Sequence, residues 1–385
     1  MRGNWNYPTA VKFGAGRVKE LGAVCKAAGI QRPLLVTDPG LAKLAMIRAA
    51  LDLLKAEGLP VELFHDLKPN PVGKNVADGV AAFKAGRHDG VVAFGGGSAL
   101  DAGKAIAFVS HQTRPLWDFE DVGDWWTRAD PAAIRPTVAV PTTSGTGSEV
   151  GRVAVIVREE THEKKLIFHP RIQPVAVIED PELTVGLPKS ITAATGMDAL
   201  AHCLEAYCAP GFHPMAEGVA LEGMRLIKDS LVLACEQPAN LEGRGKMMAA
   251  ATMGATAFQK GLGAVHSLSH PLGALYDSHH GLLNGVLMPY VLDFNRDAIE
   301  RKMRRLARHL ALRRQSTDGV IAWLLELRRA VGIPHTLPAI GIGAERMEEV
   351  IAQAVPDPST PSNPKPIDAA GFRRIFRAAV DGSIA

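Results

Sequence analysis

The sequence predicts an α/β first half built on a mostly parallel sheet, followed by an all-helical second half. Two observations lead to this fold class. Up to about residue 185, short runs of β-branched and aliphatic residues alternate with helical patterns, whereas long periodic stretches rich in Ala, Leu and Met follow Leu187 and Pro188. A chain of 385 residues is long enough for two domains. We therefore predict an α/β domain over residues 1–187 and an all-helical domain over residues 188–385.

Six short apolar runs in the first half have the length and composition of buried strands. They occupy residues 33–37, 61–64, 90–94, 137–140, 154–157 and 175–178. Helical patterns over residues 41–57 and 76–85 lie between the earlier runs. Strands that alternate with helices favour a mostly parallel sheet that is covered on both faces.

The second half contains four clear helical patterns. They lie at residues 191–209, 215–234, 243–259 and 297–311. The last pattern includes the most basic run of the chain, residues 301–310. Such a run could bind nucleic acid, but Ile299, Met303 and Leu306 recur in and beside it at helical spacing. We interpret it as the solvated face of an amphipathic helix.

The composition excludes several classes of protein. With 43 Lys and Arg against 40 Asp and Glu, the formal net charge is +3, so no nucleic-acid partner is expected. No apolar run approaches the roughly 20 residues that cross a bilayer, and residues 1–8 lack the apolar core of a signal peptide. The four cysteines form no C-x-x-C pair, which is typical of reduced thiols. We expect a soluble, cytoplasmic protein with no membrane partner.

A glycine-rich segment follows the predicted strand 90–94. Gly95, Gly96 and Gly97 lead into a helical pattern, and Ser98 and Asp101 have the spacing of a helix N-capping box. Glycines allow close approach of a ligand, and a helix N-terminus offers unpaired N–H groups to an anion such as a pyrophosphate. A simple glycine turn between strand and helix explains this segment equally well.

A second loop of this kind supports nucleotide binding. Residues 138–149 again pass from a strand into hydroxyl-rich and glycine-rich residues. Two such loops at strand ends suit a dinucleotide at the carboxyl edge of a sheet, although neither has the G-x-G-x-x-G pattern. Asp38, just after the strand 33–37, could accept hydrogen bonds from ribose hydroxyls and repel a 2′-phosphate. The alternative is that Asp38 only shapes a D-P-G turn.

Two segments of the second half carry residues that bind metals. Asp198 and His202 are four residues apart, on one face of a predicted helix. His266 and His270 have the same spacing, and His280 follows after a probable loop. A carboxylate with several imidazoles suits iron(II) or zinc, and such residues would be costly to bury without a partner. Spacing alone does not choose between His266 and His270.

Taken together, these segments resemble the group III, iron-containing alcohol dehydrogenases. The resemblance runs from Asn6 and Tyr7 to Asn363 and Pro364. The segments that carry it are Phe13–Gly16, Pro69–Pro71, Gly95–Ser98 with Asp101 and Lys104, Pro141–Glu149, Gly196–His202, His266–Gly273 and His280–Gly281.

The resemblance implies a fold of the dehydroquinate synthase-like, iron-type alcohol dehydrogenase kind, with a metal site and a cofactor site. The implied metal ligands are Asp198, His202, His266 and His280. His270 would lie near the nicotinamide and help to relay a proton, and His279 would only flank the site. The implied metal is iron(II), although zinc and other divalent ions occupy similar sites in relatives. The implied cofactor contacts are Asp38, Gly97, Ser98, Asp101, Thr142, Thr143 and Lys164, and Asp38 favours NAD over NADP.

The implied reaction is hydride transfer between NAD(H) and a small primary or secondary alcohol or aldehyde. The metal would act as a Lewis acid on the alcohol oxygen. Relatives often form dimers or larger assemblies, so a homo-oligomer is expected. The alternatives are a glycerol dehydrogenase-like zinc enzyme, a hydroxy-acid dehydrogenase of the 4-hydroxybutyrate type and, more distantly, a metallohydrolase.

Three positions depart from the usual family pattern and leave the substrate open. The segment from Phe258 to Gly261 is shorter than in many relatives, Gly151 stands where many have Thr, and residues 359–363 lack the usual Cys and Gly. All three could line the substrate pocket. Lys260 would favour a carboxylate-bearing substrate if it faced that pocket. We expect it to be solvated instead.

Overall fold

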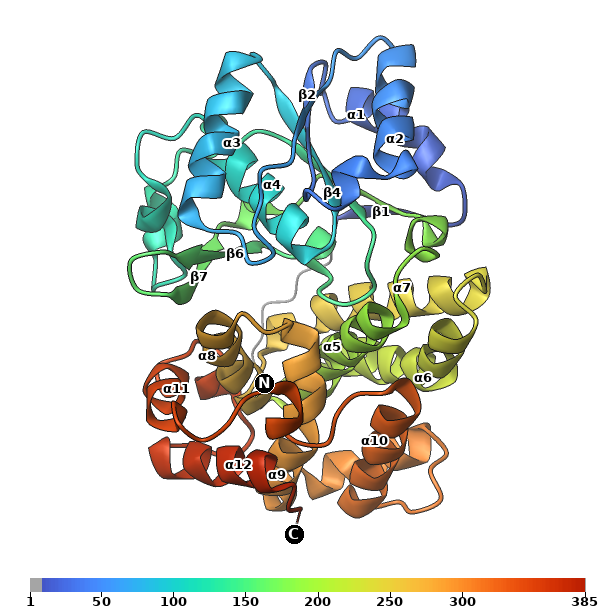
Figure 1. Ribbon diagram of the computed structural model, residues 1–385, viewed down its shortest axis with the longest axis vertical. Coiled ribbons are helices and arrows are strands. Elements are labelled where there is room, and N and C mark those ends of the chain that lie inside the picture. The colour runs from blue at the N-terminus through green and yellow to red at the C-terminus, as the bar shows by residue number, and fades with distance from the viewer. Residues whose placement is uncertain (1–8, 385) are drawn as a thin grey trace. The chain divides into compact units, whose positions relative to one another are not determined.

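The computed structural model describes residues 9–384, which form two compact units (Figure 1). The α/β unit contains the described residues up to Thr143 together with Gly147–Val185. The helical unit contains Ser144–Thr146 and the described residues from Gly186 onward. The domain boundary predicted at residue 187 remains a prediction. Asn6 and Tyr7, where the family resemblance begins, lie outside the described residues.

The α/β unit is built on a six-stranded parallel sheet, which confirms the predicted mostly parallel sheet, although its edge strand β1 was not predicted. Its strand order is β1-β8-β5-β4-β2-β3, and every neighbouring pair is parallel. The strands are β1 (Ala10–Phe13), β2 (Pro33–Val36), β3 (Glu62–Phe64), β4 (Gly90–Gly95), β5 (Thr137–Pro141) and β8 (Ala176–Glu179). All residues of β2, β4 and β5 are buried, which is the pattern of strands covered on both faces.

Helices of the α/β unit pack on the two faces of this sheet (Figure 1). They are α1 (Leu21–Ala27), α2 (Ala45–Ala56), α3 (Gly73–Ala85) and α4 (Gly97–Val109). Apolar residues of α1 and α2 share a core with Val92 and Phe94 of β4. On the opposite face, a Cβ at Gly103 of α4 would lie 2.7 Å from the Cβ of Ala93. Glycine at this position therefore lets α4 lie directly on β4.

Two predictions for this unit need correction. The predicted strand 154–157 exists as β6 (Val153–Arg158), but it pairs antiparallel with β7 (Glu163–Phe168) in a separate two-stranded sheet. A short turn with His162 in the left-handed region (φ 52°) brings β7 back beside β6, so local pairing replaces a place in the main sheet. The helix predicted from residue 41 begins only at Ala45, because Leu44 is extended.

The helical unit is formed by eight α-helices that surround a large apolar core. They are α5 (Lys189–Cys208), α6 (Pro214–Glu236), α7 (Leu241–Ala257), α8 (Ala264–Tyr276), α9 (His280–His309), α10 (Thr317–Val331), α11 (Met347–Ala354) and α12 (Ala369–Asp381). Nearly all of α5 is buried, as expected for a helix without a polar face. The all-helical second half is thus confirmed.

Helix α9 is twice as long as predicted, because the sequence pattern revealed only its second part. Ile299, Met303 and Leu306 are buried, whereas Arg301 and Arg304 are exposed. The basic run therefore lies on the outer face of an amphipathic helix, as predicted. Among residues 9–384, no helix combines the length and apolar character needed to span a membrane.

Candidate metal centre and cofactor-binding residues

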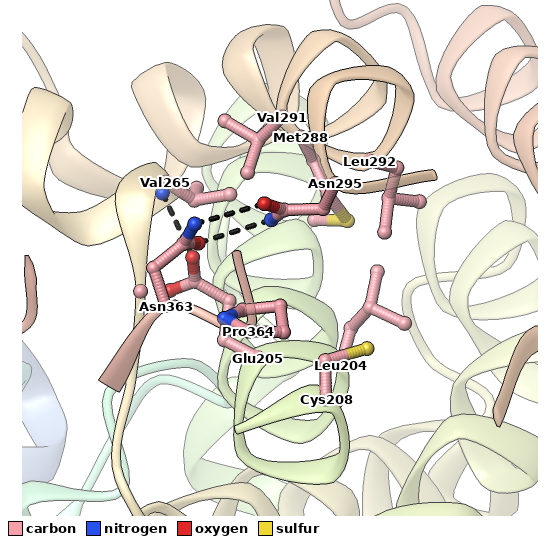
Figure 2. A pocket seen from close by; sticks show the side chains of 11 residues that line it. Leu204, Glu205, Cys208, Val265, Met288, Val291, Leu292, Asn295, Asn363 and Pro364 are labelled. Atoms are coloured by element: carbon pink, nitrogen blue, oxygen red, sulfur yellow. Dashed lines mark hydrogen bonds between the residues drawn. The ribbon is translucent and has the colours of Figure 1, made fainter. Parts of the chain in front are cut away.

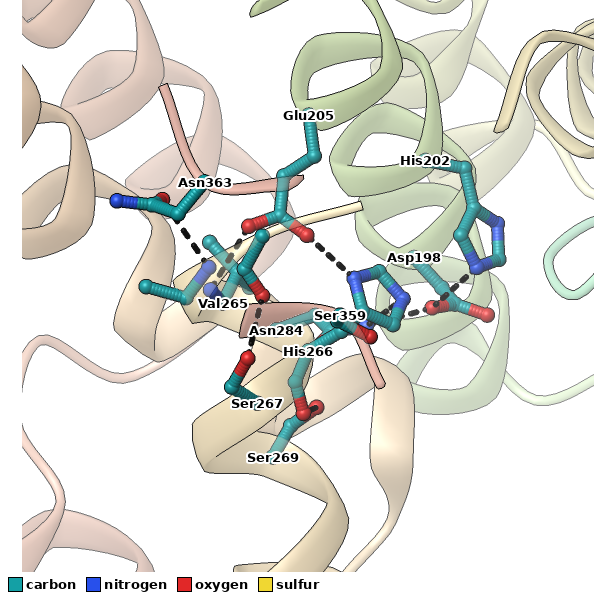
Figure 3. Close-up of polar contacts among 12 residues, drawn as sticks. Asp198, His202, Glu205, Val265, His266, Ser267, Ser269, Asn284, Ser359 and Asn363 are labelled. Atoms are coloured by element: carbon teal, nitrogen blue, oxygen red, sulfur yellow. Dashed lines mark hydrogen bonds and ion pairs between the residues drawn. The ribbon is translucent and has the colours of Figure 1, made fainter. Parts of the chain in front are cut away.

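Four side chains of the helical unit converge on one point. Asp198 and His202 come from α5 and His266 from α8 (Figure 3), and His280 is the first residue of α9. Each offers one donor atom, and the four atoms lie within 4.8 Å of one another. Asp198 Oδ1 is 3.7 Å from Nε2 of His202 and 3.7 Å from Nε2 of His280. The structure thus brings together all four predicted metal ligands.

Local packing explains how the three helices meet. Asp198 and His202 lie one helical turn apart on the same face of α5. At the start of α9, a Cβ on Gly281 would lie 2.3 Å from the backbone oxygen of Ala194. The missing side chain therefore allows α9 to begin directly against α5, which places His280 beside Asp198.

The residues of this cluster fit a divalent metal. Asp198 is 2% exposed, His202 5% and His266 1%, whereas the His280 side chain is 23% exposed. Burial lowers the pKa of His202 to about 4, so its ring is neutral at neutral pH and can act as a ligand. One carboxylate and three imidazoles form a donor set suited to iron(II) or zinc.

Asn284 of α9 extends the cluster. Its Nδ2 lies 2.7 Å from Asp198 Oδ1, 3.3 Å from His266 Nε2 and 3.2 Å from His280 Nε2. Its Oδ1 is buried and has no hydrogen-bond partner among the described residues. The sequence reasoning missed this residue, although it follows His280 by one helical turn.

A carboxylate that the sequence reasoning also missed contacts His266. Glu205 of α5 accepts a hydrogen bond from the backbone N–H of Val265 (2.8 Å), and its Oε2 is 2.6 Å from Nδ1 of His266. Burial lowers the pKa of His266, but the hydrogen bond and charge of Glu205 raise it, and the net shift is upward. Glu205 follows His202 by three residues on the same helix, a spacing that could have pointed to it.

His270 lies beside the cluster but is held by a different carboxylate. Its Nδ1 is 2.8 Å from Oδ2 of Asp357, and its ring stacks on that of His280 with centroids 5.5 Å apart. Burial raises the pKa of Asp357, but the charge and hydrogen bond of His270 lower it, and the net shift is downward. His279 is exposed.

In the α/β unit, most predicted cofactor residues gather at one edge of the sheet. Asp38 follows β2, Gly97 and Ser98 follow β4, and Thr142 and Thr143 follow β5. These strands are neighbours, and their carboxyl ends meet at the same edge because the strands are parallel. From β2 the chain continues to β3 on one side, and from β4 to β5 on the other. Ligands of open α/β sheets bind at such a switch point.

The predicted capping box at Ser98 is wrong. Helix α4 has Gly96 as its N-cap, without a side-chain cap. The hydroxyl of Ser98 donates instead to the backbone oxygen of Pro69. Because the helix already begins at Gly97, Asp101 lies more than a turn inside it and faces other partners.

Asp101 connects α4 with β6 and with the turn that precedes β6. Its carboxylate accepts hydrogen bonds from Ser148 Oγ (2.6 Å) and the backbone N–H of Val155 (3.2 Å). It also pairs with the buried Lys104 ammonium at 3.0 Å. These contacts give Asp101 a structural function in the α/β unit.

The last two cofactor candidates, Asp38 and Lys164, make different contacts. Asp38 Oδ1 accepts hydrogen bonds from the backbone N–H groups of Gly40 and Leu41, both at 2.9 Å, so this carboxylate shapes the D-P-G turn. Lys164 lies on β7 opposite Val157 of β6. The backbone N–H of Val157 in turn donates to Pro71 (2.8 Å), in the loop that follows β3.

The expectation that Lys260 is solvated is wrong. Its side chain is only 2% exposed, and its Nζ lies 2.8 Å from Glu217 Oε1 and 3.3 Å from the backbone oxygen of Tyr207. Lys302 contacts the same two groups, at 3.2 and 2.6 Å. Lys260 is drawn inward because the carbonyl groups at the C-terminal end of α5 and the Glu217 carboxylate attract cations. It is therefore neither solvated nor available to a substrate carboxylate.

The other departures from the family pattern are also explained in part. Asn363 is 5% exposed and exchanges two hydrogen bonds with Asn295, so it supports the fold (Figure 2). At Gly151, whose backbone is extended (φ −86°), an added Cβ would make ordinary contacts of 3.5 Å or more. Glycine is therefore not required there by the backbone.

Comparison with known proteins places both halves of the chain in one family. The pattern for iron-containing alcohol dehydrogenase matches residues 8–181. The pattern for the C-terminal part of the Fe-containing alcohol dehydrogenase family matches residues 192–380.

Individual relatives match over nearly the whole chain. The 4-hydroxybutyrate dehydrogenase of Cupriavidus necator is 39% identical over 382 residues, 97% of this chain and 99% of that protein. The crystal structure of a 1,3-propanediol oxidoreductase, 34% identical, has a TM-score of 0.94 and covers 98% of this chain and 100% of its own. A sulfoacetaldehyde reductase from Bifidobacterium kashiwanohense in complex with NAD+, 27% identical, has a TM-score of 0.90 over 100% of both chains.

Fold, donor set and sequence thus agree on one class of protein, the metal-dependent alcohol dehydrogenases. The chain belongs to the iron-containing alcohol dehydrogenase family. The predicted family, fold and enzyme class, an oxidoreductase acting on alcohols, are confirmed.

Proposed function

We propose that this protein transfers a hydride between a small alcohol and NAD, with Asp198, His202, His266 and His280 holding a divalent metal, iron(II) in the first place. The observation that carries this proposal is the convergence of four donor atoms from three helices within 4.8 Å. Zinc is the alternative metal, because the same donor set suits it.

The cofactor proposal rests on the carboxyl edge of the parallel sheet. The proposed NAD contacts are Asp38, Gly97, Ser98, Asp101, Thr142, Thr143 and Lys164. Gly97 and Ser98 open α4, where backbone N–H groups can bind a pyrophosphate. Asp38 favours NAD, since its carboxylate would repel the additional phosphate of NADP. NAD is also the cofactor named for the sulfoacetaldehyde reductase structure.

The chain's own residues would orient the reactants and move the proton. Asp198, His202, His266 and His280 would hold a metal that would supply a Lewis acid for the alcohol oxygen. His270 accepts the proton at Nε2, because Nδ1 faces the Asp357 carboxylate and is the nitrogen that donates to it. Asp198 supplies the one negative charge of the donor set. The nicotinamide carries the redox chemistry.

The first substrate to test is 4-hydroxybutyrate, the substrate named for the Cupriavidus necator relative. Lys260 does not serve as the partner of its carboxylate, since Lys260 pairs with Glu217. Protein loaded anaerobically with iron(II) or zinc is assayed with 4-hydroxybutyrate, 1-butanol and 1,3-propanediol, with NAD and NADP in parallel. We expect NAD-dependent oxidation of at least one of these alcohols. If none of them led to reduction of NAD, the proposed reaction would be refuted.

Replacement of His266 by Ala tests the ligand assignment most directly. It removes one of four donors, so we expect both bound metal and NAD-dependent activity to fall below detection. Metal content is measured by elemental analysis after gel filtration. His279→Ala is the matched control, because His279 is exposed in the same four-histidine segment. A metal-loaded, active His266→Ala enzyme would contradict the assignment.

We further propose that the enzyme is a cytoplasmic homo-oligomer acting on small-molecule substrates. The four cysteines, all within the described part of the chain, are free and buried, as expected in a reducing compartment. Light scattering coupled to gel filtration measures the assembly, and a mass of one chain would contradict the oligomer.

A further inference from the structure

Glu205 is a buried carboxylate that belongs to neither the predicted ligands nor the predicted cofactor contacts. It is 7% exposed and lies on α5, one turn beyond His202. Apolar side chains of Leu204, Val265 and Met288 line the small pocket beside it (Figure 2). A carboxylate in such surroundings is costly to bury unless its oxygens are hydrogen-bonded.

Both oxygens of Glu205 are committed to the start of α8. Oε1 accepts the backbone N–H of Val265 at 2.8 Å, and Oε2 lies 2.6 Å from Nδ1 of His266 (Figure 3). The N–H groups of a helix's first turn have no partner within the helix, so Glu205 satisfies one of them. The same carboxylate therefore fixes both the backbone and the ring at position 266.

The contact with His266 determines which ring nitrogen carries the proton. An ionised carboxylate only accepts hydrogen bonds, so Nδ1 of His266 must be the donor. In the neutral ring, Nε2 is then unprotonated and can act as a metal ligand. Nε2 is the nitrogen that faces the other donors, since it lies 3.3 Å from the Asn284 amide that also contacts Asp198 and His280.

We propose that Glu205 is the positioning residue of the metal centre, which holds His266 in the one tautomer and orientation that present Nε2 to the ion. The inference rests on the ligand assignment proposed above. Carboxylates that orient a ligating histidine typically change metal affinity about 10- to 100-fold when they are removed.

Glu205→Gln tests this proposal with almost no change in size. Val265 N–H and His266 Nδ1–H contact different oxygens of Glu205, and an amide has only one oxygen, so an amide in the same position can accept only one of these two hydrogen bonds. If the oxygen stays on Val265, the amide NH2 faces Nδ1 and moves the ring proton to Nε2, which blocks the ligand. We expect iron(II) and zinc to bind roughly 10- to 100-fold more weakly, measured by competition with a chromophoric chelator.

Glu217→Gln is the matched control for general destabilisation. Glu217 is also a carboxylate of the helical unit bound to cations, but it contacts Lys260 and Lys302 rather than a proposed ligand. We expect this variant to lose thermal stability and to keep wild-type metal affinity. Equal losses of metal affinity in the two variants would overturn the proposal, as would wild-type affinity in Glu205→Gln.

The tautomer itself gives a second measurement, which needs no variant. Nitrogen-15 NMR of imidazole-labelled, metal-free wild-type protein, at a pH where the ring is neutral, should show His266 protonated at Nδ1 and unprotonated at Nε2. Protonation at Nε2 would overturn the proposal even if Glu205→Gln failed to fold. A wild-type protein that binds neither metal would instead refute the ligand assignment, so the two failures are distinguishable.

Discussion

Two polar clusters on helix α5 are organised in opposite ways. Around Asp198, one carboxylate and three imidazoles point their donor atoms at one another within 4.8 Å. At the C-terminal end of the same helix, the ammonium groups of Lys260 and Lys302 contact the Glu217 carboxylate and the backbone oxygen of Tyr207. Lone pairs converge in the first cluster, whereas opposite charges are paired in the second.

This difference separates a binding site from a structural contact. Buried lone pairs that face one another are costly unless a cation lies among them. Paired charges need no further ligand, and they tie helices together. Lys260 is not expected to bind a substrate carboxylate, because its ammonium group already contacts the Glu217 carboxylate. The four donors around Asp198 face one another instead and can therefore bind a cation.

We expect the largest effect on the metal cluster from a methyl group added at the start of α9. Gly281→Ala places a Cβ 2.3 Å from the backbone oxygen of Ala194, which cannot move easily, so His280 must shift away from Asp198. We expect a stability loss of about 1–3 kcal/mol from overpacking, together with weaker metal binding. Denaturant unfolding of metal-free protein and chelator competition measure the two effects.

Gly218→Ala provides the control for Gly281→Ala. Gly218 lies inside α6, and an added Cβ would meet nothing within 4 Å. We expect a gain of roughly 0.5–1 kcal/mol, because glycine is unfavourable within a helix, and unchanged metal binding. Equal metal affinity in the two variants would show that the position of α9 does not control the cluster.

Asp38 has one structural contact and one proposed function in cofactor binding, and the two can be tested separately. Its Oδ1 is paired within the turn, by Gly40 and Leu41, whereas its negative charge is proposed to discriminate against NADP. Asp38→Asn keeps an oxygen for the turn and removes the charge. We expect the preference for NAD over NADP to fall roughly tenfold, about 1.4 kcal/mol, with unchanged thermal stability. The ratio of kcat/KM for the two cofactors measures it.

Asp38→Ala is the complementary variant, which removes the charge and the turn acceptor together. It should shift the cofactor preference to a similar extent and also lower the melting temperature. If Asp38→Asn left the cofactor ratio unchanged, Asp38 would only shape the turn.

Local spacing in the sequence predicted part of the site, and the full ligand set came from the family resemblance. Residues four apart share a helix face, so Asp198 and His202 could be paired from the pattern alone. Residues that follow neighbouring parallel strands share an edge, which predicted where Asp38, Ser98 and Thr142 lie. The first rule acts within one helical turn, whereas the second needs only the assumption that the predicted strands are parallel neighbours in one sheet.

Contacts between distant segments could not be predicted in this way. His266 and His270 have equivalent local spacing, and their surroundings differ because Glu205 contacts the first and Asp357 the second. These partners lie 61 and 87 residues away in the chain. The burial of Lys260, through its contact with Glu217, depends on tertiary packing in the same way.

The smallest expected effect concerns the cluster of Lys260, Lys302 and Glu217. It is a dependence of the protein's stability on pH. Burial lowers the pKa of Lys260 to about 8, although Glu217 acts in the opposite direction. An unfolded lysine titrates near ~10.4, so between these values the unfolded chain binds one more proton than the native protein. Stability contributed by Lys260 must then rise as the pH increases from about 8 to about 10.

Lys260→Met isolates this contribution. The free energy of unfolding is measured by denaturant titration for wild type and variant at several pH values on both sides of this window. The difference in favour of the wild type should grow as the pH rises, because neutral Lys260 no longer incurs the cost of a buried charge. A difference that shrinks would mean that Glu217 dominates and raises this pKa. The ratio of activities on 4-hydroxybutyrate and 1-butanol should not change, since Lys260 is held by Glu217 in the native protein.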